Sequence, residues 1–205
     1  MNKPIISIIS SIAGICTLLF IVLHLAVNLL LVLDAIANTQ GYYYNSMHYF
    51  MQHNSVAYTL EKTFALGFVL HILLANILAF NKIRNKQGSK DMIIMGFLLL
   101  IFTVLHVLQF KVKRTIEYVE LDGVLKPDIY QFISHFFSSN WQYSLLYMFS
   151  GILLGVHLQN GFVSMIKKIN IDKKYQKLIS ITIKITSYSI MIGFLLIPLY
   201  FLFFS

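Results

Sequence analysis

Five long runs of apolar residues dominate the chain, and short polar segments separate them. The runs extend over Ile5 to Leu33, Val56 to Phe80, Met92 to Phe110, Trp141 to Ile166 and Leu178 to Phe204. As a helix, each run covers roughly 30 Å or more, which is enough to cross the hydrocarbon core of a bilayer. Lipid offers the backbone no hydrogen bonds, and the alternation of membrane β-strands is absent. The pattern predicts an all-α membrane protein, with five transmembrane helices in one bundle and one domain over residues 1–205.

The composition supports a membrane protein. Hydrophobic residues make up 58% of the chain and charged residues 12%, about half the share in a soluble domain. These values exclude a disordered chain and argue against an ordinary soluble globule. The net charge is +8, but the basic residues lie in short segments between apolar runs, so we expect no nucleic-acid partner.

The charges also predict an orientation. Ten of the sixteen basic residues fall on one side of the predicted bundle, and six of the eight acidic residues fall on the other. The basic group is Lys3, Lys82, Arg84, Lys86, Lys90, Lys167, Lys168, Lys173, Lys174 and Lys177. The acidic group is Asp34, Glu61, Glu117, Glu120, Asp122 and Asp128. Because positive loops stay inside, we expect the N-terminus inside and the C-terminus outside.

Two longer outer loops, 34–55 and 111–140, are rich in tyrosine and phenylalanine. Aromatic side chains favour the membrane interface, so we expect short helices on the outer surface. Trp141, at the outer edge of the fourth run, fits an interface anchor.

Four histidines lie inside the apolar runs, one in each of the first four: His24, His71, His106 and His157. Ionisable side chains are costly in lipid, so they are functional candidates there. A hydrogen bond between helices is the alternative for any one of them. The other three histidines, His48, His53 and His135, fall in the outer loops.

Depth sorts the four histidines into two pairs. His24 and His106 lie ten and five residues before the outer ends of their runs, at Asp34 and Lys111. His71 and His157 lie eleven and ten residues before the inner ends of theirs. The depths predict two metal sites stacked along the membrane normal.

The donor set favours haem over zinc. Zinc takes three or four protein ligands, and no run places a second ligand near its histidine. A haem iron needs only two axial imidazoles, and such ligation favours electron transfer because no position stays open. Gly67 and Gly161 lie one turn from His71 and His157, where they leave room for a macrocycle or serve helix packing. We expect the carbonyl four residues earlier, such as that of Gly67 for His71, to accept the Nδ1 proton.

Polar residues at the inner ends are placed to contact haem propionates. They are Ser10 and Ser11 in the first run, and Lys167 and Lys168 after the fourth. The positive-inside rule explains the lysines equally well.

Several motifs resemble one family in order and spacing. They are SSIAGICTLLFIVLHLAVN (Ser10 to Asn28), YNSMHYFMQHNSVAYTLE (Tyr44 to Glu61), HVLQF (His106 to Phe110), HLQNGFVS (His157 to Ser164) and GFLLIPLY (Gly193 to Tyr200). The pattern resembles the di-haem cytochrome b membrane anchor of succinate dehydrogenase and quinol:fumarate reductase, in its five-span, single-subunit form. The resemblance covers nearly the whole chain.

The resemblance implies two haem b groups, one between His24 and His106 and one between His71 and His157, with Ser11 and Lys168 at the propionates. It implies flavoprotein and iron–sulfur subunits docked on the inner face, membrane quinone as substrate (menaquinone), and a place in the bacterial cytoplasmic (inner) membrane. The chain departs from the family at two places. Ile12 and Ala13 replace a lysine pair, and Gly155 replaces a glutamate that assists proton movement in some members.

The quinone site should lie near the outer haem and the polar outer loop. Asn45, His48 and Glu61 are candidates to hydrogen-bond the quinone or take its protons, and ordinary surface polarity is the alternative for each. Other functions stay open: a cytochrome b of another membrane dehydrogenase, or a haem-free tether or transporter. A transporter usually shows internal repeats or broken spans, and we expect neither here.

Overall fold

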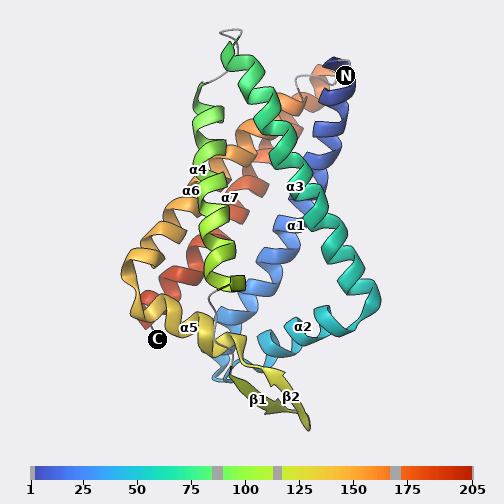
Figure 1. Cartoon of the computed structure of the whole chain (residues 1–205). Helices are drawn as coiled ribbons and strands as arrows, with labels where there is room; N and C mark the ends of the chain where they lie inside the picture. Colours follow the sequence, from blue (N-terminus) through green and yellow to red (C-terminus); the bar gives the residue numbers. More distant parts are fainter. Residues whose placement is uncertain (1–2, 85–89, 113–116, 167–171, 205) are drawn as a thin grey trace.

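The computed structural model describes residues 3–84, 90–112, 117–166 and 172–204. The elements, in chain order, are α1 (Lys3–Ala37), α2 (Tyr42–His53), α3 (Ser55–Arg84), α4 (Lys90–Val107), the π-helix η1 (Leu108–Val112), β1 (Tyr118–Leu121), β2 (Val124–Pro127), α5 (Ile129–Ser139), α6 (Trp141–Ile166) and α7 (Lys173–Phe204). Figure 1 shows five long helices in a bundle, with the shorter elements gathered at one end. The predicted all-α membrane bundle is confirmed.

Five stretches are long and apolar enough to cross a membrane. They are Ile9–Ala37, Ser55–Asn81, Lys90–Phe110, Trp141–Ile166 and Lys174–Phe204. The predicted runs match them closely, and the fourth has the same bounds. The side of the membrane that each end faces stays a prediction. We therefore call the end with α2, the strands and α5 the hairpin end, and the opposite end the N-terminal end.

The bundle consists of two helix pairs with α7 behind them. α1 packs along α3, α4 packs along α6, and α7 lies against both α6 and α1. Glycines allow α7 to approach closely. A Cβ on Gly155 would lie 2.7 Å from Cβ of Met191, and one on Gly193 would lie 2.8 Å from Leu25 Cδ2. Between the described parts of α3 and α4 there is no extensive contact.

The hydrophobic core concentrates at the hairpin end, where α1 and α7 meet α2 and α5. Leu31 and Phe201, 0% and 1% exposed, lie at its centre. Asp34 is buried beside them and accepts backbone hydrogen bonds from Tyr43 (3.0 Å) and Tyr44 (2.7 Å) at the start of α2. The Asp34 carboxylate therefore accepts from N–H groups at the start of α2 that have no partner within the helix, and it fixes the turn from α1 into α2.

The prediction of short surface helices is confirmed for α2 and α5 but missed a hairpin. β1 and β2 pair antiparallel, and Leu121 lies opposite Val124. The turn residues Asp122 and Gly123 have φ of 55° and 72°, which suits the Asp-Gly pair of a tight hairpin. Lys126 donates to the Ser46 hydroxyl at 3.0 Å, and this bond attaches the hairpin to α2.

Candidate functional site

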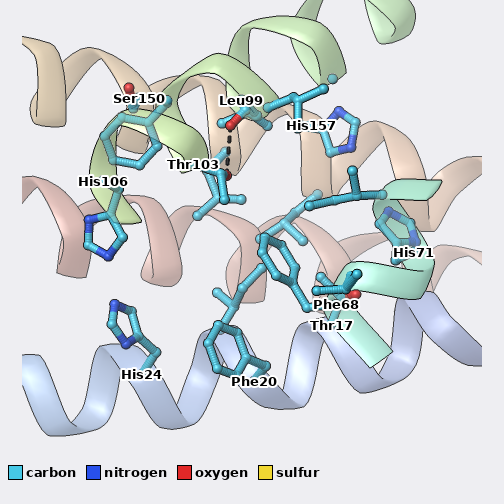
Figure 2. Close-up of a pocket in the computed structure, with 18 of the residues that line it drawn as sticks. Thr17, Phe20, His24, Phe68, His71, Leu99, Thr103, His106, Ser150 and His157 are labelled. Carbon is cyan, nitrogen blue, oxygen red and sulfur yellow. Dashed lines mark hydrogen bonds between the residues drawn. The ribbon is translucent and has the colours of Figure 1, made fainter. Parts of the chain in front are cut away.

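A large cavity of about 2370 Å³ runs through the bundle between α1, α3, α4 and α6. Ligand pockets for small molecules usually measure about 300–1,000 Å³, so this cavity has room for more than one large ligand. All four histidines predicted from the sequence line it: His24, His71, His106 and His157. Figure 2 shows two of them at each end of the close-up, with their rings pointing into the cavity.

The first pair, His24 of α1 and His106 of α4, lies toward the hairpin end. The two ring centroids are 5.8 Å apart, and the ring planes are nearly perpendicular at 89°. A metal ion held about 2 Å from one nitrogen of each imidazole separates the centroids by roughly 6 Å. The pair therefore has the separation at which two imidazoles would hold one metal ion.

Asn28 contacts the first pair from the next turn of α1. Its amide donates to the His24 carbonyl at 2.7 Å and lies 3.3 Å from His24 Nε2. A metal at Nε2 would replace the longer contact. The amide would keep the shorter bond, so the replacement leaves it with a partner.

The second pair, His71 of α3 and His157 of α6, lies toward the N-terminal end. Both rings line the cavity at this end, and the Ser10 backbone is a hydrogen-bond partner of His71. Nδ1 of each ring is buried without a hydrogen-bond partner. The expectation that the Gly67 carbonyl accepts from His71 Nδ1 is therefore wrong. Buried Nδ1 atoms that lack protein partners fit a site whose remaining interactions come from a bound group.

Aromatic and apolar side chains separate the two pairs. Phe20 stacks on His24 with centroids 5.8 Å apart and on Phe68 at 5.5 Å. The hydroxyls of Thr17 and Thr103 donate to carbonyls of their own helices at 2.8 Å, those of Ala13 and Leu99. These hydroxyls are satisfied within the helices, so the middle of the cavity is an apolar environment.

The sequence left two roles open for the glycine one turn before His71, room for a macrocycle or helix packing. A Cβ on Gly67 would lie 2.4 Å from Cβ of Cys16, so this glycine serves the close packing of α1 on α3. A Cβ on Gly161 would meet nothing within 4 Å, and Gly161 lines the cavity, which agrees with the first alternative.

Two other glycines face the histidines of the second pair. A Cβ on Gly14 of α1 would lie 3.5 Å from His71 Nδ1, and one on Gly96 of α4 would lie 3.6 Å from His157 Cε1. Each glycine begins the same pattern on its helix: Gly14, Phe20 and His24 have the spacing of Gly96, Phe102 and His106. Comparing the residues before each histidine would have found this shared spacing.

Comparisons with known proteins do not identify a function for this cavity. No protein-family model, curated protein or solved structure matches this chain. Across the residues that the structure describes, no cluster of three or more His, Cys, Asp or Glu side chains could hold a metal ion. Two paired imidazoles suit a cofactor that supplies most of the metal ligands itself.

Only two of the predicted propionate contacts, Ser10 and Ser11, fall within the described residues, at the N-terminal end of the bundle. Ser11 lines the cavity there, next to Ser10. Lys167 and Lys168 lie outside the described residues.

The predicted quinone residues separate into two groups. His48 and Glu61 line the hairpin end of the cavity. Asn45 does not line it: the side chain is 1% exposed and joins α2 to α5. Its Oδ1 accepts from the backbone of Ile129 (3.1 Å) and Tyr130 (3.0 Å), and its Nδ2 donates to Asp128.

Proposed function

We propose that this protein is a membrane cytochrome b that binds two haem b groups and carries electrons through the bilayer. The observation that carries the proposal is the His24–His106 pair, whose centroids lie 5.8 Å apart across the cavity. The second pair, His71 and His157, lines the same cavity at the other end and supports a second haem. Haem supplies one-electron redox chemistry when bound.

The residues of the chain determine which haem chemistry is available. His24 with His106, and His71 with His157, would each hold one haem with two imidazoles, which would leave its iron no open position for oxygen. The middle of the cavity between the two sites is lined by apolar side chains, including Phe20 and Phe68. Both features favour electron transfer over oxygen activation.

The finer proposal is the membrane anchor subunit of a succinate:quinone oxidoreductase in the bacterial cytoplasmic membrane. The sequence motifs that resemble this family support it. In this assignment a flavoprotein and an iron–sulfur subunit dock on the inner face, and Ser11 and Lys168 contact propionates. Quinone, with menaquinone as the expected type, binds at the hairpin end, where His48 and Glu61 line the cavity.

The test is a reduced-minus-oxidised absorption spectrum of protein purified from its native membrane, with haem quantified per chain. We expect two b-type haems. Alanine at His24 or His106 should remove one of them, and alanine at His71 or His157 should remove the other. His135→Ala is the matched control, because His135 is exposed on α5 and contacts Ser139 within the same helix.

The proposal fails if the wild-type protein contains no haem, or if His71→Ala leaves the spectrum and the haem content unchanged. The finer assignment has its own measurement. The native complex should co-purify with a flavin-containing subunit and succinate activity, and a cytochrome of another dehydrogenase would bring neither.

A further inference from the structure

A chain of two hydrogen bonds leads away from His106. His106 Nδ1 lies 3.1 Å from the Tyr147 hydroxyl of α6, and this hydroxyl donates to Oε1 of Gln109 at 2.7 Å. A phenol hydroxyl can donate one hydrogen bond, and Tyr147 donates it to Gln109. The phenol oxygen must therefore accept from His106 Nδ1–H. This bond fixes the tautomer of His106 and leaves the lone pair on Nε2, the nitrogen available to a metal.

Aromatic neighbours hold the Tyr147 ring in place. The ring centroid lies 4.9 Å from Phe102, 5.1 Å from Phe137 and 5.9 Å from Phe110. The three contacts come from α4, α5 and η1, so elements on several sides fix the position of the hydroxyl. A preorganised hydroxyl loses little freedom when it accepts the bond from His106.

The other partner, Gln109, lies in the π-helix η1, which follows α4 directly after His106 and Val107. Single π turns inside helices are rare and frequently occur at functional sites. Here the π turn contains Gln109, which accepts the hydrogen bond from the Tyr147 hydroxyl.

The pair at the N-terminal end has no equivalent of this chain. Nδ1 of His71 and Nδ1 of His157 are both buried without a hydrogen-bond partner. The two sites are therefore built differently, although each presents two imidazoles.

We propose that Tyr147, with Gln109 behind it, is a positioning residue that lowers the reduction potential of the hairpin-end haem. This inference rests on the proposed function. A hydrogen bond from Nδ1–H to an acceptor makes the imidazole a more basic ligand, and a more basic ligand favours the oxidised iron. Through this bond the chain distinguishes the potentials of its two sites.

The experiment is a redox titration of Tyr147→Phe, which keeps the ring and removes the hydroxyl. We expect two haems and a higher potential for one of them. Loss of such a hydrogen bond typically changes metal affinity or activity about tenfold or more. A tenfold change in the equilibrium constant of a one-electron couple corresponds to about 59 mV, which is the size of shift we expect. Gln109→Leu should shift the same haem in the same direction by less. The His157→Ala background, which retains only the hairpin-end haem, identifies which potential moved.

Tyr143→Phe is the matched control. Tyr143 lies one turn earlier on α6 and stacks on Phe136 at 5.2 Å, so this variant removes the same atom away from His106. It should leave both potentials in place. The inference is overturned if Tyr147→Phe retains two haems at wild-type potentials, or if Tyr143→Phe produces an equal shift. If Tyr147→Phe fails to assemble, Gln109→Leu decides, because it leaves the aromatic cluster intact. A wild-type chain without haem would instead refute the proposed function.

Discussion

Gly96 offers a sharp test of how the second site is built. A Cβ at this position would lie 3.6 Å from His157 Cε1, which is ordinary contact without overlap. Leucine extends three carbons beyond the Cβ, and they must enter the space in front of the imidazole. Overpacking of this kind costs about 1–3 kcal/mol, which corresponds to roughly 5- to 150-fold weaker binding of the ligand. We therefore expect Gly96→Leu to lose the haem between His71 and His157 and to keep the other.

The assay is haem per chain in detergent-purified protein, with helix content from circular dichroism as the folding control. Gly96→Ala should stay close to wild type, because its single carbon makes only normal contact. Gly14→Leu should act like Gly96→Leu, because a Cβ on Gly14 would lie 3.5 Å from His71 Nδ1. Ala26→Leu, on the exposed side of α1, adds similar bulk away from the cavity. Two haems per chain in both Gly96→Leu and Gly14→Leu would refute the argument.

Two further predictions concern stability. Gly67→Ala should lower the free energy of unfolding by about 1–3 kcal/mol, because its Cβ would lie 2.4 Å from Cβ of Cys16. Thermal unfolding in detergent measures the loss, Cys16→Gly in the same chain should recover part of it, and unchanged stability would contradict the packing assignment. At the hairpin end, burial and then the nearby Asp34 raise the pKa of Tyr130. The unfolded tyrosine loses its proton first, so stability should fall as the pH rises above about 10, more in wild type than in Tyr130→Phe. An equal fall in both proteins would exclude Tyr130 as the cause.

The sequence predicts the spans well because their length is set by the bilayer and not by neighbouring residues. The run Trp141 to Ile166 has the same bounds as α6 for this reason. Depth along a span is equally local: counting residues to the ends of two runs was enough to pair His24 with His106, whose rings meet in the structure.

The features that depend on which helix faces which were not predictable in this way. Periodicity places Gly67 on the same face as His71, but only the packing of α1 shows that Cys16 fills that space. Asn45 is similar. A polar residue in an aromatic loop suggested ligand binding, and its partner Asp128 lies 83 residues away in the sequence. The hairpin had a local signal, Asp122-Gly123, which the aromatic content of its loop obscured.

Because the bundle consists of two helix pairs, the positions of the four histidines have a structural consequence. α1 pairs with α3 and α4 with α6, while the described parts of α3 and α4 have no extensive contact. Each candidate site takes one imidazole from each pair: His24 and His71 come from the first, His106 and His157 from the second. A group bound at either site therefore joins the two halves across the cavity, in addition to α7 behind them and the α2–α5 contacts at the hairpin end. Under the proposed function, haem binding adds its free energy to the association of the halves, so loading the cofactor and closing the bundle are one coupled equilibrium.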